Sequence, residues 1–130
     1  MDMKLELVPV PVSDIDRAKA FYVTVGFHAD VDTQPREGMR IVQLTPPGSA
    51  CSILLSTGLE QLTDMAPGTV RGLHLVVNDI QQARADLQHR GLVVGAIEDT
   101  GGGVMYAQLT DPDGNTLVLQ QMDWRTGDAF

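Results

Sequence analysis

The chain has 130 residues, 43% of them hydrophobic, which is enough for one globular domain with a real core. Seventeen acidic and nine basic side chains give a formal charge of −8, which repels the phosphates of nucleic acids and anionic membrane surfaces, so we expect neither as a partner. There is no apolar run near the roughly 18 residues that span a bilayer, no signal-peptide pattern and only one cysteine, Cys51, which together predict a cytoplasmic protein without an intrachain disulfide.

The first predicted element is a strand over residues 5–12. Its apolar face repeats at period two and consists of Val8, Val10 and Val12. Pro9 and Pro11 lie between these valines. Because proline cannot donate a backbone hydrogen bond, they indicate an edge strand or a bulged one.

A helix follows, with Ser13 as its expected N-cap and Asp14 and Asp16 in a first turn where the helix dipole favours negative charge. Its apolar stripe at the helical period consists of Ile15, Ala18, Tyr22 and Val25. Gly26 ends the helix. Three short strands are then predicted over 27–32, 39–44 and 52–56, with turns over 34–38 and 45–49. The first unit is therefore β-α-β-β-β.

The same order of elements recurs after a linker over 63–68. The residues that define the second strand and helix are Leu73, Leu75 and Val77 on the strand face, Asn78 or Asp79 as N-cap, Ile80, Ala83 and Leu87 on the helix stripe, and Gly91 as the helix stop. Strands are predicted near 92–97, 105–109 and 116–121. The intervening Asp111-Pro-Asp-Gly-Asn115 predicts a tight turn, because Pro presets φ and Gly or Asn tolerates positive φ.

The two halves of the chain also match each other directly. Sliding the sequence on itself by 65 positions without a gap gives twelve identities, among them Gln43/Gln108 and Leu54/Leu119. Chance would supply about four. This duplication predicts one domain over 1–130 made of two pseudo-symmetric units, about 1–62 and 68–124, with a functional site where they meet.

Several motifs along the chain are distinctive. They are Val12-Ser-Asp-Ile-Asp-Arg-Ala-Lys-Ala-Phe-Tyr22, Gly26-Phe27, Val77-Asn-Asp-Ile80, Arg90-Gly91 and Asp111-Pro-Asp-Gly-Asn115. Through these motifs the chain resembles the vicinal oxygen chelate superfamily, which includes glyoxalase I, bleomycin-resistance proteins, fosfomycin-resistance enzymes and extradiol dioxygenases. The resemblance covers nearly the whole chain. The resemblance implies an α+β fold in which two βαβββ units form a curved mixed sheet around a cavity, usually as a homodimer.

The resemblance also implies where a metal would bind. Metal-dependent relatives hold a divalent ion through His and carboxylate side chains on the first and last strand of each unit. The corresponding positions here are Leu7, Gly72, Val118 and either Leu54 or, by the gapless repeat, Ile53. None has an oxygen or imidazole donor for such an ion. We therefore expect no metal and no other cofactor, and metal-dependent lyase or dioxygenase chemistry is disfavoured.

Strand parity predicts the lining of the cavity, because valines and leucines that face the helices send their neighbours to the opposite face. The inward set is Leu7, Pro9, Ile41, Gln43, Leu54, Gly72, His74, Tyr106, Gln108, Val118 and Gln120. An apolar lining with a few amide, phenol and imidazole groups is typical of a small-molecule site. The predicted ligand contacts are Leu7, Ile41, Gln43, Leu54, His74, Tyr106, Gln108, Val118, Gln120 and, in the C-terminal tail, Trp124.

Some of these residues also have a purely structural interpretation. His74 is a hydrogen-bond donor, a general base or a lone metal contact on one interpretation, and a satisfied core or pocket histidine on the other. Gln43 and Gln108 could cross-link strands without touching a ligand. Tyr106 and Trp124 favour ligand or subunit contact, although a tryptophan in a tail often seals a core edge.

Two functions from different classes remain open. The first is a non-catalytic binding protein of the bleomycin-resistance type, which sequesters or senses a small hydrophobic or aromatic compound in a dimer-interface cavity. The second is an enzyme: a metal-independent isomerase, epimerase or lyase with His74 or Tyr106 as acid or base, or a metalloenzyme with relocated ligands. A structural or regulatory dimer without a ligand is the third interpretation.

Overall fold

A computed structural model describes residues 1–125, apart from the side chains of Gln61 and Thr63, and the chain divides into two compact units. Unit 1 comprises Met1–Val70 together with Asp111–Asn115. Unit 2 comprises Arg71–Thr110 and the chain from Thr116 onward. The units thus follow the halves of the sequence, except that one short connection of the second half belongs to unit 1.

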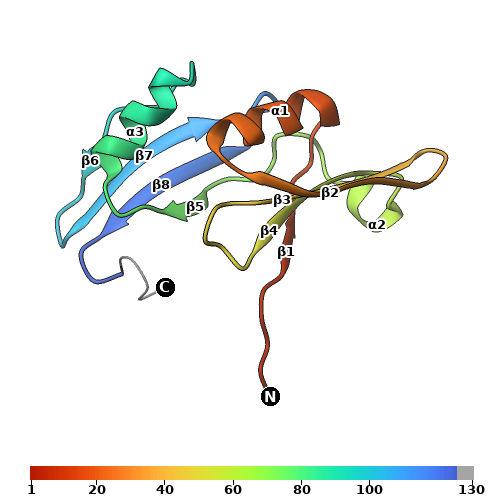
Figure 1. Ribbon diagram of the computed structural model, residues 1–130, viewed down its shortest axis with the longest axis horizontal. Coiled ribbons are helices and arrows are strands. Elements are labelled where there is room, and N and C mark those ends of the chain that lie inside the picture. Colours follow the sequence, from red (N-terminus) through yellow and green to blue (C-terminus); the bar gives the residue numbers. More distant parts are fainter. Residues whose placement is uncertain (126–130) are drawn as a thin grey trace. The chain divides into compact units, whose positions relative to one another are not determined.

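Unit 1 is a βαβββ unit with one additional short helix. Its elements are β1 (Leu7–Pro9), α1 (Ile15–Val25), β2 (His28–Arg36), β3 (Met39–Thr45), β4 (Ser52–Thr57) and α2 (Glu60–Thr63). The sheet order is β1-β4-β3-β2, with β1 parallel to β4 and the other pairs antiparallel. The helix α1 lies along one face of this sheet (Figure 1). The α2 turn was not expected from the sequence.

Unit 2 repeats the arrangement. Its elements are β5 (Leu73–Val76), α3 (Ile80–His89), β6 (Glu98–Asp99), β7 (Val104–Thr110) and β8 (Thr116–Met122). The sheet order is β5-β8-β7-β6, and β5 runs parallel to β8 as β1 does to β4. The predicted α+β fold of two βαβββ units is therefore confirmed. No helix within residues 1–125 is long and apolar enough to cross a membrane.

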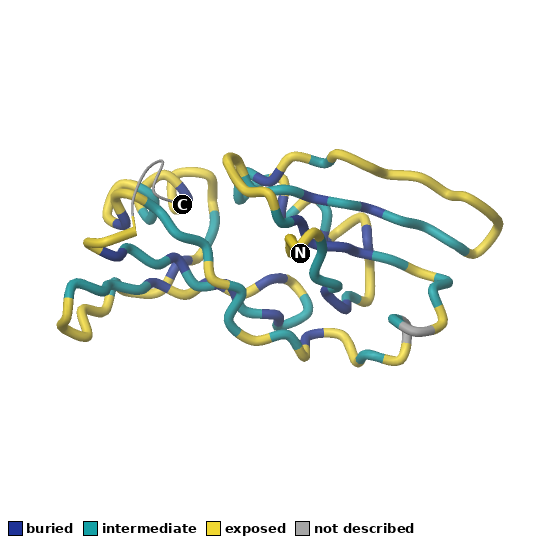
Figure 2. The backbone as a smooth tube through the Cα atoms, turned by 90° about the horizontal axis from the view of Figure 1, so that it is seen from below, coloured by how far each residue is buried: buried dark blue, intermediate teal, exposed yellow. Residues whose placement is uncertain are grey.

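Each sheet buries one face against its helix. The side chains that fill the two cores include Val42, Leu44, Leu55, Tyr22 and Ala18 in unit 1, and Leu109, Leu117, Leu119, Ala107 and Ile80 in unit 2. Along β3, β7 and β8 the intervening residues are mostly less buried, as period-two alternation requires, whereas Ser52–Leu55 of β4 are all buried. Figure 2 shows this contrast in the long β2–β3 hairpin, where β2 is exposed and β3 alternates between buried and half-buried residues.

The N-caps are aspartates in both units. Asp14 accepts a hydrogen bond from the backbone N–H of Arg17, and Asp79 accepts one from that of Gln82. The expectation of a Ser13 cap is wrong, because the Ser13 hydroxyl donates instead to Asp113 at 2.5 Å. Of the two candidates in the second unit, the structure selects Asp79 over Asn78.

Three predicted strands differ from the sheets as built. The strand predicted over 27–32 continues as β2 to Arg36, into the turn predicted over 34–38. The strand predicted over 5–12 is reduced to β1, since the flanking Pro11 has no N–H to continue the ladder. The strand predicted near 92–97 is absent from the described structure, and only the two-residue β6 follows it. In that segment Gly95 donates to the Gln108 carbonyl, while the carbonyls of Val94 and Gly95 accept from the Arg84 side chain. The Arg84 guanidinium thus donates to backbone carbonyls that would bond to a neighbouring strand in a regular sheet.

The register shows that the two units are not related by a constant offset. Gln43 faces Leu54, eleven positions on, whereas Gln108 faces Val118, ten positions on. The β3–β4 connection therefore contains one residue more than the β7–β8 connection. Leu54 and not Ile53 is the structural equivalent of Val118, and the Leu54/Leu119 identity of the gapless match does not join equivalent positions.

A buried polar cluster fastens the Asp111–Asn115 turn within unit 1. Oδ2 of Asp111 accepts hydrogen bonds from the Tyr22 hydroxyl at 2.9 Å and from Nδ2 of Asn115 at 2.8 Å. Its Oδ1 accepts from the backbone N–H groups of Asp113 and Asn115, each at 2.9 Å. Asn115 Nδ2 also donates to the Pro11 carbonyl. Burial and the nearby Asp111 carboxylate raise the pKa of the Tyr22 phenol well above its usual range, so it stays a neutral donor.

Candidate functional site

Three strands of unit 2 bring predicted ligand residues into adjacent rows. In the first row His74 of β5 lies opposite Val118 of β8, which lies opposite Gln108 of β7. In the next row Tyr106 lies opposite Gln120. Because the alternate residues of β7 and β8 are buried against the core, the side chains of both rows occupy the other face of the sheet.

This face of unit 2 contains a cavity of about 480 Å³. Its lining consists of His74, Gly95, Ala96, Glu98, Tyr106, Ala107, Gln108 and Val118. A volume of this size suits a small organic molecule. The cavity thus brings together four of the predicted ligand residues, all from strands that are adjacent in the sheet. Gln120 is half-buried next to this lining, and Trp124 is 60% exposed and does not belong to it.

His74 has a defined orientation in this cavity. Its Nδ1 lies 2.6 Å from the carbonyl oxygen of Gly72. A carbonyl oxygen can only accept a hydrogen bond, so Nδ1 carries the proton and Nε2 of the neutral ring keeps a lone pair. This arrangement supports an acceptor or base at Nε2.

Sequence reasoning missed the part of the lining that follows α3. Gly95, Ala96 and Glu98 line the cavity, and Glu98 lies opposite Tyr106 in the β6–β7 pair. The sequence had predicted a regular strand ending at Ile97, which gave no reason to place Glu98 in a site. An acidic residue next to an apolar run was the one available signal.

The corresponding face of unit 1 holds the remaining predicted ligand residues. Leu54 lies between Pro9 of β1 and Gln43 of β3, and Ile41 lies opposite Ser56. Leu54 is buried, with 6% of its surface exposed, whereas Leu7, Ile41 and Gln43 are half-buried. Their contact with a ligand stays a prediction.

The positions that the resemblance assigns to metal ligands lack ligand atoms. Leu7, Leu54 and Val118 are aliphatic, and Gly72 has a φ of +75°, a left-handed backbone in which a larger residue such as histidine would be strained. Within the described part of the chain, no group of three or more His, Cys, Asp or Glu side chains is arranged to hold a metal ion. These positions therefore do not fit the metal of the metal-dependent relatives.

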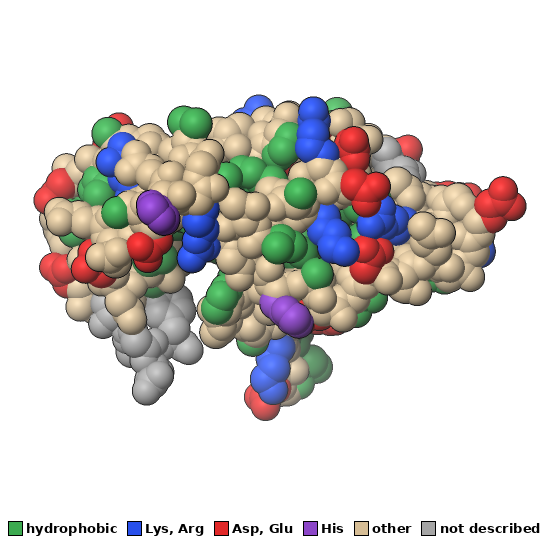
Figure 3. All heavy atoms as spheres, turned by 45° about the horizontal axis from the view of Figure 1, so that its top comes forward, with side chains coloured by type: hydrophobic (Ala, Val, Ile, Leu, Met, Phe, Trp, Pro, Cys, Tyr) green, Lys and Arg blue, Asp and Glu red, His purple; other side chains and the backbone are tan. Residues whose placement is uncertain are grey.

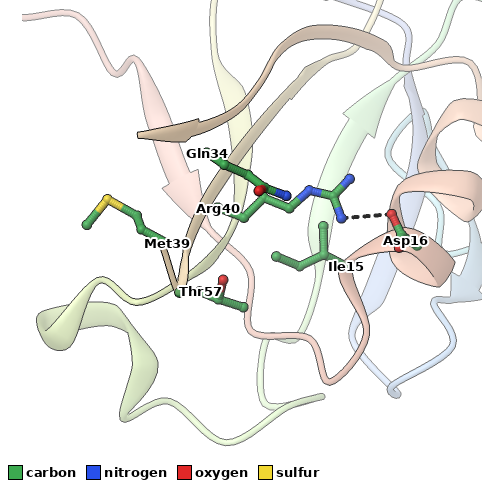
Figure 4. A pocket seen from close by; sticks show the side chains of 7 residues that line it. Ile15, Asp16, Gln34, Met39, Arg40 and Thr57 are labelled. Carbon is green, nitrogen blue, oxygen red and sulfur yellow. Dashed lines mark hydrogen bonds and ion pairs between the residues drawn. The ribbon is translucent and has the colours of Figure 1, made fainter. Parts of the chain in front are cut away.

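A second cavity, of about 310 Å³, lies in unit 1 (Figure 4). Its lining consists of Ile15, Asp16, Gln34, Gly38, Met39, Arg40 and Thr57. The Arg40 guanidinium donates to Asp16 at 2.7 Å and to both carboxylate oxygens of Asp32, at 3.0 and 2.9 Å. Lys19 donates to the same Asp32 at 2.7 Å. The charged groups of this cavity thus neutralise one another.

The ion pairs also set the charge states of this cluster. Hydrogen bonds from Arg40 and then Lys19 hold the pKa of the Asp32 carboxyl well below its usual range. Hydrogen bonds to Asp32 and Asp16 raise the pKa of the Arg40 guanidinium. Figure 3 shows acidic and basic side chains next to one another over α1 and the β2–β3 hairpin. The cluster is better suited to join α1 to the hairpin than to bind a charged ligand.

Comparison with known proteins yields a family and several similar structures. The sequence model of the Glyoxalase/Bleomycin resistance protein/Dioxygenase superfamily matches residues 4–119. No curated protein is significantly similar in sequence.

Three solved structures illustrate the similarity. TnmS3, an antibiotic binding protein from Streptomyces sp. CB03234, is 38% identical with a TM-score of 0.80, over 94% of this chain and 98% of that one. A glyoxalase/bleomycin resistance protein from the same Streptomyces is 40% identical with a TM-score of 0.75, over 91% of this chain and 100% of that one. A superfamily member from Sphaerobacter thermophilus DSM 20745 is 30% identical with a TM-score of 0.79, over 92% of this chain and 98% of that one.

Proposed function

The chain belongs to the Glyoxalase/Bleomycin resistance protein/Dioxygenase superfamily, and from this premise we propose that it binds a small hydrophobic or aromatic molecule and sequesters or senses it unchanged. The observation that carries the proposal is the cavity of unit 2, in which residues from β5, β7 and β8 meet on one face. The similarity to TnmS3, an antibiotic binding protein, supports the same class of function.

The chemistry of the lining favours a ligand that is mostly apolar with a few polar groups. Ala96, Val118 and the ring of Tyr106 supply apolar surface, and the polar ends of His74 and Gln108 lie in the same row of the sheet. Apolar contact provides most of the binding free energy of such sites, while the few polar groups fix the orientation of the ligand.

The proposal does not include a metal. The four positions that would supply ligands in metal-dependent relatives are Leu7, Leu54, Gly72 and Val118, and none has a donor atom. Stoichiometric Ni, Zn, Fe or Mn that survives dialysis of the purified protein would overturn this part of the proposal and favour an enzyme with relocated ligands.

A metal-independent isomerase, epimerase or lyase is the second candidate. The observation that favours it is the free Nε2 of His74, which could accept a proton from a bound substrate, with the Tyr106 hydroxyl as the partner acid. For this enzyme, His74→Ala should abolish turnover of a substrate that the variant still binds. Unchanged turnover would remove His74 from the mechanism.

Binding is tested most directly by blocking the cavity. We expect naphthalene-sized aromatic probes to shift the NMR signals of unit 2 saturably and to be recovered unchanged. Val118→Phe should abolish the shifts, because the larger ring occupies the space between His74 and Gln108. Val31→Phe, on the exposed strand β2, is the matched control and should leave them intact. Binding that survives Val118→Phe would contradict the proposal.

The proposal extends to a homodimer, which the family resemblance implies, and to a location in the cytoplasm. Size-exclusion chromatography with light scattering measures the assembly directly. We expect twice the 14.0 kDa of a single chain. A monomeric mass at micromolar concentration would remove the dimer while leaving the cavity of unit 2 unaffected.

A further inference from the structure

We propose that His74 is the hydrogen-bond acceptor of the unit 2 cavity, and that the ligand is a neutral aromatic or conjugated compound that donates an O–H or N–H to Nε2 of this ring. This inference rests on the proposed function and deepens it. It replaces a general preference for aromatic compounds with a requirement for a donor group at one place in the cavity.

The first step is the tautomer. Nδ1 of His74 lies 2.6 Å from the carbonyl oxygen of Gly72, which has no proton to give. The neutral imidazole therefore carries its proton on Nδ1. Its Nε2 is left as an sp² nitrogen with a lone pair, which accepts a hydrogen bond and cannot donate one.

The second step is the backbone that holds the carbonyl in place. Gly72 has a φ of +75°, and its N–H donates to Oγ1 of Thr116 at 2.7 Å. Gly72 is thereby tied, next to its carbonyl, to the first residue of β8. A Cβ at position 72 would lie 3.4 Å from Cε1 of His74, and the left-handed φ would be strained for any residue with a side chain. Gly72 is therefore a positioning residue for the imidazole.

The third step is the charge of the cavity. Among the residues that line it, Glu98 carries a carboxylate and none is a lysine or arginine. A ligand with a carboxylate or phosphate would meet Glu98 and the lone pair of Nε2 without a compensating cation, and like charges repel one another. A neutral ligand with a hydroxyl or N–H pairs with Nε2 instead.

Two related probes test the requirement for a donor. 2-Naphthol and 2-methoxynaphthalene have the same aromatic surface, and only the first has a hydroxyl hydrogen. We expect 2-naphthol to bind roughly three- to tenfold more tightly, the range of one net hydrogen bond. His74→Leu should remove this difference while leaving an apolar cavity. His89→Leu, at an exposed histidine of α3, should preserve it.

The tautomer can be measured without any ligand. Long-range ¹⁵N–¹H correlation at pH 8.5, where imidazoles are ordinarily neutral, should show a protonated Nδ1 and an unprotonated Nε2 for the ring whose signals disappear in His74→Leu. Gly72→Ala should shift this ring toward the other tautomer and reduce the preference for 2-naphthol. A packing role alone would predict neither change.

The outcomes separate the inference from the function on which it rests. Equal affinity of the two probes, or a protonated Nε2 in the wild type, would overturn the inference and leave a binding cavity in place. If neither probe shifts the signals of unit 2, the proposed function itself fails for aromatic ligands, whatever the tautomer. A preference for 2-naphthol that persists in His74→Leu would also overturn the assignment of the acceptor.

Discussion

The two units use equivalent positions of their sheets in different ways. In unit 1 the row Pro9, Leu54 and Gln43 contains a proline and a buried leucine. In unit 2 the equivalent row holds an exposed imidazole, a half-buried valine and an exposed amide, and all three line a cavity. Both sheets therefore keep a helix-facing core, while the open face of unit 2 carries more exposed polar side chains in this row than that of unit 1.

Polar side chains of unit 1 are instead paired with one another. The Asp111 carboxylate accepts four hydrogen bonds inside the unit, and Asp32 is shared by two cations on its surface. In unit 2, by contrast, His74 and Glu98 line a cavity, and only Nδ1 of His74 is bonded to the described part of the fold. The comparison teaches that a polar residue is a better candidate for ligand contact when its hydrogen-bonding capacity is not already used by the fold.

The largest predicted effect comes from the buried cluster of unit 1. Asp111→Ala leaves the Tyr22 hydroxyl, one of the two N–H bonds of the Asn115 amide and two backbone N–H groups without an acceptor in a buried site. We expect the free energy of unfolding to fall by about 3–5 kcal/mol, because each unsatisfied buried donor costs about 1–3 kcal/mol and only part can be recovered by relaxation. Urea denaturation followed by circular dichroism measures this loss.

A milder variant separates the contribution of the Tyr22 hydroxyl from that of the whole cluster. Tyr22→Phe removes one donor and leaves the other three, so the loss should be about 1 kcal/mol. If Asp111→Ala lowered the free energy of unfolding no more than Tyr22→Phe, the other hydrogen bonds of the cluster would contribute little to stability. The pairing of polar side chains in unit 1 would then not explain how it differs from unit 2.

The two helix caps test how far the units remain alike. Asp14 caps α1 and Asp79 caps α3, with oxygen to nitrogen distances of 3.1 and 3.0 Å. Asp14→Ala and Asp79→Ala should each lower the free energy of unfolding by about 1 kcal/mol. Thermal or urea unfolding of both variants gives the comparison. Losses that differ by more than about twofold would show that the equivalent caps no longer have equivalent roles.

Much of the fold could be predicted because local patterns repeat in the sequence. The helix stripe, Gly26 after α1 and the glycine after α3 set the helices within a residue of their observed ends. The strand over 92–97 could not be predicted correctly, since its apolar residues look like a strand while the Arg84 side chain supplies the hydrogen bonds. The extra residue before β4 could not be found either, because an alignment without gaps cannot represent an insertion.

The lining of the candidate site could be predicted in part from strand parity. Parity placed His74, Tyr106, Gln108 and Val118 on one face, and the structure brings these four to one cavity. It could not reveal the Gly72 carbonyl behind His74, because a tautomer depends on a backbone conformation two residues away. It also could not show that the Asp111 turn would pack in unit 1, since that contact spans 89 residues from Tyr22.

The smallest effect concerns the surface ion pairs of unit 1 and their dependence on pH. Arg40 and Lys19 lower the pKa of Asp32, so its ion pairs stabilise the folded state fully above the unfolded value of about 3.9. This contribution is lost as the pH falls through the lower folded value. Wild type should therefore be slightly more stable than Asp32→Asn at pH 5 and above, and the difference should shrink toward pH 2.

The size of this difference is limited by solvent. The Asp32 and Arg40 side chains are 28% and 21% exposed, and exposed ion pairs contribute little net stability in water. Urea unfolding at several pH values, repeated in 1 M salt where the screening length falls to about 3 Å, should show the difference diminishing with both acid and salt. A difference that stayed constant from pH 5 to pH 2 would mean that Asp32 acts through packing of the β2–β3 hairpin. Asp32 would then stabilise unit 1 through the packing of its side chain as much as through its charge.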